Sequence, residues 1–173
     1  VSDAGVLKRM DYSYIKGGGK IGQVVSATKT DTFTGYSAAS WGDVTDLTVS
    51  ITPAATTSKV FVTANIGYGG SSNFYGGFRF VRDSTAIAIG DAAGSRIRST
   101  MTADVSGSQG PYKFLSSSMS YLDSPSTTSA TTYKIQMYAG DSGSGEVNVS
   151  NQDDDADYQQ RSASTITVME VLA

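Results

Sequence analysis

The chain has 173 residues, which fits a single domain with a hydrophobic core of its own. It contains no Cys and no His, and this excludes disulfides, zinc–thiolate sites and His-based nucleophilic triads. Its 13 Lys and Arg against 16 Asp and Glu give a net charge of −3, which disfavours a nucleic-acid binder.

The N-terminal residues differ from the rest of the chain. Residues 1–16 contain a stretch, DAGVLKRMDYSYIK, that fits a short helix or an extended arm, and the glycines of KGGGK follow it as a flexible joint. We therefore predict an N-terminal arm with a glycine hinge at 1–19 and a globular unit at 20–173. No apolar run approaches the roughly 18 residues of a membrane span, so we expect no membrane insertion.

Short runs of Val, Ile, Thr, Tyr and Phe alternate with polar residues along the rest of the chain. This period of two is typical of half-buried β-strands, and Gly, Ser, Asp and Pro interrupt it between the runs. The pattern predicts an all-β sandwich or barrel. The predicted strands are Ile21–Thr28, Thr45–Ile51, Lys59–Tyr68, Phe78–Arg82, Thr85–Ile89, Lys113–Leu122, Thr131–Tyr138, Gly145–Ser150 and Ser164–Val171, with a weaker stretch at Ile97–Val105.

The final predicted strand, Ser164–Val171, has apolar residues on both faces. Ile166 and Val168 lie on one face, and Met169 and Val171 lie on the other. A strand of this kind is buried centrally in its own sheet, or a neighbouring subunit covers its second face. The residues leave both alternatives open.

An acidic run precedes this last strand. Asp153, Asp154, Asp155 and Asp157 place four carboxylates within five residues, and calcium takes six to eight oxygen ligands from clustered carboxylates and carbonyls. The run lacks the alternate spacing and central glycine of an EF-hand loop. Two interpretations stay open: a solvated acidic loop between strands, or a site for a calcium ion. No other cofactor is expected.

The segment Tyr68–Gly77, with the sequence YGGSSNFYGG, has the composition of a binding loop. Tyr supplies rigid amphipathic contact area, and Gly, Ser and Asn supply adaptable hydrogen bonding. We predict receptor contacts at Tyr68, Asn73, Phe74 and Tyr75. The alternative is a glycine-rich turn whose aromatic side chains pack on the sandwich itself.

No catalytic motif stands out. Ser13 and Lys16 match the four-residue serine–lysine acylation pattern, but no Lys-Thr-Gly follows. Most Asp residues lie beside Gly, Ser or Thr in expected turns, where a carboxylate bonds its own backbone, so a pair of catalytic acids is not indicated. We therefore predict that the protein is not an enzyme.

Five segments, taken in order, resemble a known group: GKIGQVVSATKTDTFT, DVTDLTVSITPAATTSKVFVTANI, GDAAGSRIRST, YLDSPSTTSATTYKIQMYA and STITVMEV. They are similar to the C-terminal domain of bacteriophage virion appendage proteins of the tail-fibre or head-fibre type, of marine phages and cyanophages. The resemblance covers about residues 18–173. It implies a jelly-roll-like antiparallel β-sandwich that forms a homotrimer at the virion surface, with a structural or adhesive role and without catalysis.

The opening VSDAGVLKRMDYSYIKG is similar to the trunk segments that precede such a domain, so we expect the chain to be the distal part of a larger protein. Three functions follow as expectations. The first is the distal domain of a homotrimeric tail or head fibre that adheres to a glycan or protein of the host surface, with its arm contacting other virion proteins. The second is a capsid decoration protein whose arm clamps capsomers. The third is a monomeric carbohydrate-binding module that requires calcium at Asp153–Asp157.

Overall fold

The computed structural model describes residues 20–35, 39–105, 112–140 and 143–172, so the predicted arm at 1–19 lies outside the described residues. Within these ranges the chain forms eleven strands and no α-helix, and each predicted strand overlaps an observed one. The all-β prediction is confirmed. The strands are β1 (Ile21–Lys29), β2 (Phe33–Thr34), β3 (Ser40–Ile51), β4 (Lys59–Gly70), β5 (Tyr75–Arg82), β6 (Thr85–Ile87), β7 (Met101–Asp104), β8 (Phe114–Asp123), β9 (Thr131–Ala139), β10 (Gly145–Val147) and β11 (Ser164–Val171).

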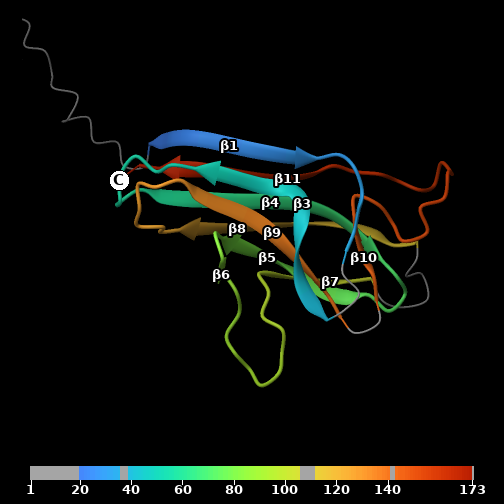
Figure 1. Ribbon diagram of the computed structural model, residues 1–173. Helices are drawn as coiled ribbons and strands as arrows, with labels where there is room; N and C mark the ends of the chain where they lie inside the picture. Colours follow the sequence, from blue (N-terminus) through green and yellow to red (C-terminus); the bar gives the residue numbers. More distant parts are fainter. Residues whose placement is uncertain (1–19, 36–38, 106–111, 141–142, 173) are drawn as a thin grey trace, which may run out of the picture.

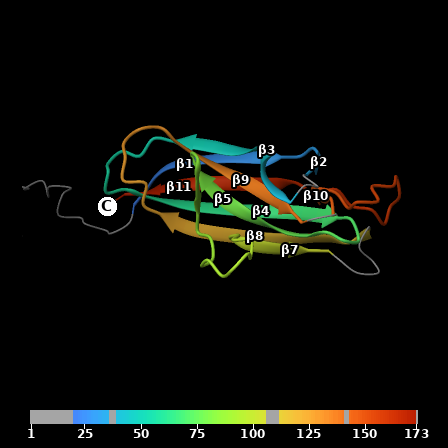
Figure 2. The ribbon, with the colours of Figure 1, turned by 60° about the horizontal axis from the view of Figure 1, so that its bottom comes forward.

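Two antiparallel sheets stack face to face (Figures 1 and 2). Among the described residues, the larger sheet has the order β1-β11-β4-β10-β2, with β8 on the other side of β4. The smaller sheet has the order β3-β9-β5-β6, and β7 also pairs with β5. This arrangement confirms a sandwich of antiparallel sheets. The jelly-roll connectivity and the trimer stay predictions.

Alternating burial explains why these segments form strands. In β9, Tyr133, Ile135 and Met137 are buried, and the residues between them are partly exposed. In β11, Ile166 and Val168 are buried, whereas the residues between them are partly exposed. Successive strand residues point to opposite faces, so each strand contributes one apolar row to the interior. Of the two apolar faces of Ser164–Val171, the one with Ile166 and Val168 points into the interior.

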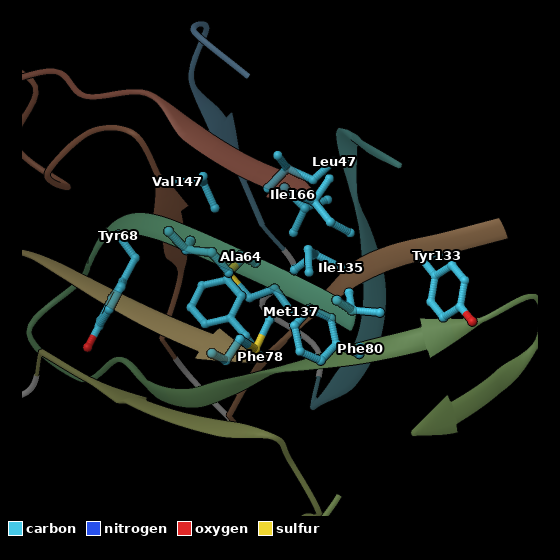
Figure 3. Packing of buried hydrophobic residues seen from close by; sticks show 14 of the residues in the cluster. Leu47, Ala64, Tyr68, Phe78, Phe80, Tyr133, Ile135, Met137, Val147 and Ile166 are labelled. Carbon is cyan, nitrogen blue, oxygen red and sulfur yellow. The ribbon is translucent and has the colours of Figure 1, made fainter. Parts of the chain in front are cut away.

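The hydrophobic core lies between the two sheets (Figure 3). Phe78 and Phe80 of β5 and Ile135 of β9 face Ala64 of β4 and Ile166 of β11 across the interior. All five are at most 2% exposed. Full burial of a side chain such as Phe or Ile contributes roughly 1.5–3 kcal/mol, so burial of these residues stabilises the contact between the sheets.

Two buried charged groups join the sheets at opposite edges of the sandwich. Lys29, at the end of β1, is 1% exposed; its Nζ lies 2.8 Å from a carboxylate oxygen of Asp31 and donates to Thr45 Oγ1 of β3 at 3.3 Å. At the other edge, Asp123 ends β8 and accepts hydrogen bonds from Arg82 Nη1 at 2.8 and 2.9 Å and from the Tyr133 hydroxyl at 2.7 Å. Lys29 and Asp123 are thus each paired with an opposite charge, which removes most of the cost of taking them out of water.

Strand β3 begins at Ser40, whereas the predicted strand begins at Thr45. The prediction starts late because a bulge interrupts the alternation of apolar and polar residues. The register of β3 with β9 shifts in this region, and Asp46 has a φ of 66°. The irregularity lets Val44 and Leu47 both enter the core, although their odd spacing would place them on opposite faces of a regular strand.

Candidate functional site

A row of residues crosses the outer face of the smaller sheet. Cross-strand pairs join Trp41 of β3 to Tyr138 of β9, Tyr138 to Gly77 of β5, and Gly77 to Thr102 of β7. Directly opposite residues share a face of the sheet, so the two rings and the hydroxyl lie on the same side. The ring centroids of Trp41 and Tyr138 are 5.5 Å apart, with the planes tilted by 50°. The row therefore forms an aromatic surface of Trp41 and Tyr138 next to Gly77, which has no side chain.

A polar ladder fixes this aromatic surface on one side. Arg79 donates two hydrogen bonds to Gln136 Oε1, at 2.9 and 2.7 Å, and Gln136 and Lys134 both donate to Asp43. The Arg79 guanidinium lies 4.1 Å from the centroid of the Trp41 ring, a cation–π contact. Burial raises the pKa of Asp43, but the bonds from Lys134 and Gln136 outweigh it and hold that pKa below 3.8. Asp43 is therefore ionised at neutral pH and anchors the ladder.

A hollow of about 380 Å³ lies beside the row, between β5, β7 and the end of β9. This volume falls within the roughly 300–1,000 Å³ of small-molecule sites. The side chains that give it chemical character are Tyr75, Ile97, Ser99, Thr102, Asp104 and Tyr138. The hollow thus combines aromatic surface, hydroxyls and one carboxylate.

Two glycines shape the hollow. A Cβ at Gly140 would lie 2.3 Å from the Tyr75 ring, so the ring packs directly on this glycine. A Cβ at Gly77 would lie 2.9 Å from Cβ of Ser99, so Ser99 covers this position. Side chains at either glycine would displace the residues that form the walls.

The structure corrects the prediction of receptor contacts at Tyr68 and Phe74. Tyr68 is 5% exposed and its ring lies 5.6 Å from that of Phe78. Phe74 is fully buried, and Cβ atoms at Gly70 and Gly145 would lie 2.6 and 2.5 Å from it. Both aromatic side chains belong to the core and cannot contact a receptor. The glycine-rich composition serves the packing of Phe74.

The other two predicted contacts lie at the surface. Asn73 is exposed, and Tyr75 is 51% exposed and lines the hollow. Receptor binding at these two residues stays a prediction. Sequence reasoning missed Tyr138 and Thr102. The alternation in Thr131–Tyr138 already placed Tyr138 on the outer face, but no sequence signal showed which residues of β5 and β7 lie beside it.

The acidic run does not assemble into a metal site. Asp153 accepts hydrogen bonds from Arg161 at 2.7 and 2.8 Å, and Asp154 accepts one from Gln152. All four carboxylate residues, including Asp155 and Asp157, are exposed. In the part of the chain that the structure describes, no three potential metal-ligating side chains form a group that could hold an ion. The run is thus an exposed loop in which Arg161 pairs with Asp153, and calcium binding there stays a prediction.

The outer face of the larger sheet carries a second feature, which we call the apolar row. Cross-strand pairs join Val24 of β1 to Met169 of β11, Met169 to Phe61 of β4, and Phe61 to Leu122 of β8. Val24 is 56% exposed and Leu122 is 44% exposed. The next row along the sheet, Ser26-Thr167-Thr63-Ser120, has only hydroxyl side chains.

The described residues include no helix with the length and apolar character needed to cross a bilayer.

Comparisons with known proteins identify no family for this chain. No family model and no curated protein matches the chain. Among solved structures, a chain of the infectious bursal disease virus Gx strain matches with a TM-score of 0.37 and 15% identity, covering 86% of this chain and 40% of that one. This chain therefore spans less than half of that protein. At such a TM-score the match carries no argument about function.

Proposed function

We propose that this chain is a non-catalytic, self-associating domain at the distal end of a phage virion appendage, and that it adheres to the host cell surface. The observation that carries the proposal is the apolar row Val24-Met169-Phe61-Leu122 on the outer face of the larger sheet. The virion location, the adhesive role and the number of three copies come from the resemblance to virion appendage domains.

The apolar row supports self-association because it leaves large side chains in water. Four apolar residues from four strands lie side by side, and two of them are about half exposed. Contiguous apolar patches on a soluble protein mark contact surfaces. Closed symmetry would let the same row of each copy cover that of its neighbours. Contact between copies would thus explain why the strand Ser164–Val171 also carries apolar residues on its outward face.

The hydroxyl row beside it also suits a contact between copies. The Ser26 and Thr167 hydroxyls already bond each other at 2.8 Å, so part of their hydrogen-bonding capacity is satisfied within the chain. Neither row contains a charged residue. Burying these two rows therefore avoids the desolvation of charges, which is the largest penalty that an interface can incur.

The placement of the two faces fits a stalk-mounted adhesive domain. The apolar row lies near Lys20 and the C-terminal end of the sandwich, where Leu172 N donates to Lys20 O (Figure 1). The hollow lies toward the opposite end, where β5 begins and β9 ends (Figure 1). Association through the apolar row, at the end of the sandwich that contains Lys20, leaves the opposite end of each copy free for a receptor.

Adsorption experiments test this proposal. Antibodies against the purified chain should label appendages on intact particles in electron micrographs, and the soluble chain should reduce adsorption of those particles to host cells. The Phe61→Glu variant should reduce adsorption less than the wild type, because fewer linked copies give less avidity. The matched variant Thr48→Glu, on the outer face of the smaller sheet, should act like the wild type. Absence of label from the particles would contradict the proposal.

A further inference from the structure

The loop between β6 and β7, residues 88–100, projects from the smaller sheet on the side away from the larger sheet (Figures 1 and 2). Backbone hydrogen bonds hold it in a defined shape. Gly90 N donates to Ser99 O at 3.3 Å across its base, and Arg96 N donates to Ala93 O at 3.3 Å midway along it. The loop therefore presents its side chains from a fixed backbone.

Two exposed arginines, Arg96 and Arg98, lie in this loop. Arg98 Nε donates to Gly90 O at 2.6 Å, and Arg96 Nη1 donates to Ala93 O at 3.2 Å. Each guanidinium is thus anchored by one bond to a neutral carbonyl, and its remaining N–H groups make no hydrogen bond within the part of the chain that the structure describes. Groups that are positioned before a ligand arrives lose little further side-chain freedom when it binds.

Neither arginine has a carboxylate partner among the described residues. The ion pairs of those residues involve other cations, namely Lys29, Arg82, Lys134 and Arg161. The loop contains a single acidic residue, Asp91, and it takes part in none of these pairs. Two positive charges two residues apart are therefore left without a nearby counter-charge, and such a cluster attracts an anion.

The chemistry of the two guanidiniums favours a phosphate group. Each guanidinium presents a planar fork of N–H donors that matches the oxygens of a carboxylate or a phosphate. A single fork already satisfies both oxygens of a carboxylate. A phosphate monoester has one more outer oxygen and a charge of about −1.5 to −2, so it can accept bonds from both arginines at once.

The surroundings of the arginines indicate what carries the phosphate. Ile97, between the two arginines, is 49% exposed and lines the hollow together with Tyr75 and Tyr138. A ligand held by its phosphate at the loop therefore has apolar and aromatic surface beside it. The ring of a phosphorylated sugar suits this surface, because its C–H groups form an apolar face.

We propose that Arg96 and Arg98 of the β6–β7 loop bind a phosphate monoester carried by a glycan of the host surface. This inference rests on the adhesive role proposed above and gives that role its ligand chemistry. The loop projects on the side of the smaller sheet, so association of copies through the apolar row of the larger sheet leaves it accessible (Figures 1 and 2).

The test is an NMR titration of the isotope-labelled full chain in a phosphate-free buffer of low ionic strength, since salt screens exposed charges. The probes are glucose 6-phosphate, inorganic phosphate, glucuronate and glucose. We expect glucose 6-phosphate to shift the backbone amide signals of Arg96, Ile97 and Arg98 with a millimolar dissociation constant. Inorganic phosphate and glucuronate should shift the same signals with weaker binding, and glucose should leave them unchanged.

Three variants locate the site, and one variant serves as the control. Arg96→Ala and Arg98→Ala should each weaken binding of glucose 6-phosphate about tenfold or more, because each removes charge-assisted hydrogen bonds. Arg96→Lys keeps the charge but loses the planar fork, and should also weaken binding. The control Lys59→Gln removes one positive charge from an exposed residue of β4 and should leave binding unchanged.

Several outcomes would overturn the inference. It fails if glucose 6-phosphate does not shift the loop signals, if glucuronate binds as tightly, or if Lys59→Gln weakens binding as much as the arginine variants do. Equal affinity for inorganic phosphate would overturn the assignment to a sugar phosphate. Binding to phosphatidylcholine vesicles that contain phosphatidate, without binding to glucose 6-phosphate, would also overturn it, because the source would then be a lipid.

Adsorption experiments separate this inference from the proposed function. If the soluble Arg98→Ala variant reduces adsorption of particles as much as the wild type does, the inference is overturned and the adhesive role stands. If the loop binds glucose 6-phosphate but antibodies against the chain do not label the particles, phosphate binding is supported and the proposed function is contradicted.

Discussion

Phe74 shows at the scale of one residue how packing can imitate a binding loop. The segment around it is rich in Gly, Ser and Tyr, yet the Phe74 ring lies between Gly70 and Gly145 in the core. Only residues without a Cβ allow the backbone to come this close to a ring. The same composition that adapts a loop to a ligand here adapts two strands to a buried side chain.

This packing makes the first prediction. Gly70→Ala places a Cβ 2.6 Å from Phe74, so the ring or the strand must move. Overpacking of a filled core costs typically about 1–3 kcal/mol, and we expect a loss of that size in the free energy of unfolding measured in urea. Gly90→Ala is the control because nothing lies within 4 Å of its Cβ. Equal stability of the two variants would contradict the packing described for Phe74.

Glu170 makes a prediction about pH. It is 1% exposed, and its Oε1 accepts a hydrogen bond from Ala54 N at 2.6 Å. This bond, helped by Gln23 and opposed by burial, holds the pKa of Glu170 below its ordinary value of 4.5. A carboxyl whose pKa is lower in the folded state stabilises the fold above its ordinary pKa, and that contribution is lost as pH falls through the folded value.

We therefore expect Glu170→Gln to lower the free energy of unfolding by about 2 kcal/mol at pH 7, since the bond from Ala54 goes to a charged acceptor. The difference from the wild type should shrink as the pH falls below 4.5. Urea unfolding at a series of pH values measures it, with the exposed Asp91→Asn as control. A difference that stays constant or grows below pH 4.5 would show that the Glu170 charge is not what stabilises the fold.

At the scale of elements, Asp123 links the two sheets at one end of the sandwich. It lies in β8 of the larger sheet, whereas its partners Arg82 and Tyr133 lie in β5 and β9 of the smaller sheet. Burial together with the bond to the Asp123 carboxylate raises the pKa of the Tyr133 hydroxyl well above its ordinary range, so that hydroxyl keeps its proton and stays a donor.

Removal of this link should cost more than removal of an exposed ion pair. Asp123→Ala leaves Arg82 and Tyr133 without their partner. We expect a loss of about 3 kcal/mol in unfolding free energy, the lower end for a buried pair because the Arg82 side chain is 26% exposed. Asp43→Ala breaks the more exposed pair with Lys134 and should cost about 1 kcal/mol or less. Similar losses in both variants would contradict the role of Asp123 as the link.

Strand periodicity made much of this fold predictable. Ser164–Val171 was predicted with the observed bounds, because Ile166 and Val168 alternate with threonines in the first part of the strand. The two-residue strand β2 was missed because two residues cannot display a period. The predicted start of β5 at Phe78 was three residues late, because Gly76 and Gly77 resemble loop residues in the sequence. In the structure β5 begins at Tyr75, and the backbones of both glycines pair with β7 and β9.

The candidate site was less predictable because it depends on cross-strand register. Trp41, Tyr138 and Thr102 are far apart in the sequence and meet only through the pairing of β3, β9, β5 and β7. Local periodicity places a residue inside or outside, but it does not determine which strands lie side by side. Of the four predicted receptor contacts, Tyr75 alone reaches the hollow, through its position at the start of β5.

At the scale of the whole molecule, we assign self-association to the outer face of the larger sheet and ligand binding to the outer face of the smaller sheet. The apolar row and its hydroxyl neighbour suit copies of the same chain, and the hollow at the other end suits a ligand. Three copies held near the chain entry would present three hollows together, so that weak individual binding becomes firm attachment through avidity. Self-association is thus the claim on which the adhesive function depends.

The solution mass of the purified chain, measured by light scattering, tests this claim most directly. We expect three times the 18.0 kDa of one chain for the wild type and for Thr48→Glu. Phe61→Glu should have the mass of a single chain, because it places three buried charges at the centre of the proposed contact. A wild-type mass of 18.0 kDa, or a Phe61→Glu variant that stays assembled, would contradict the account.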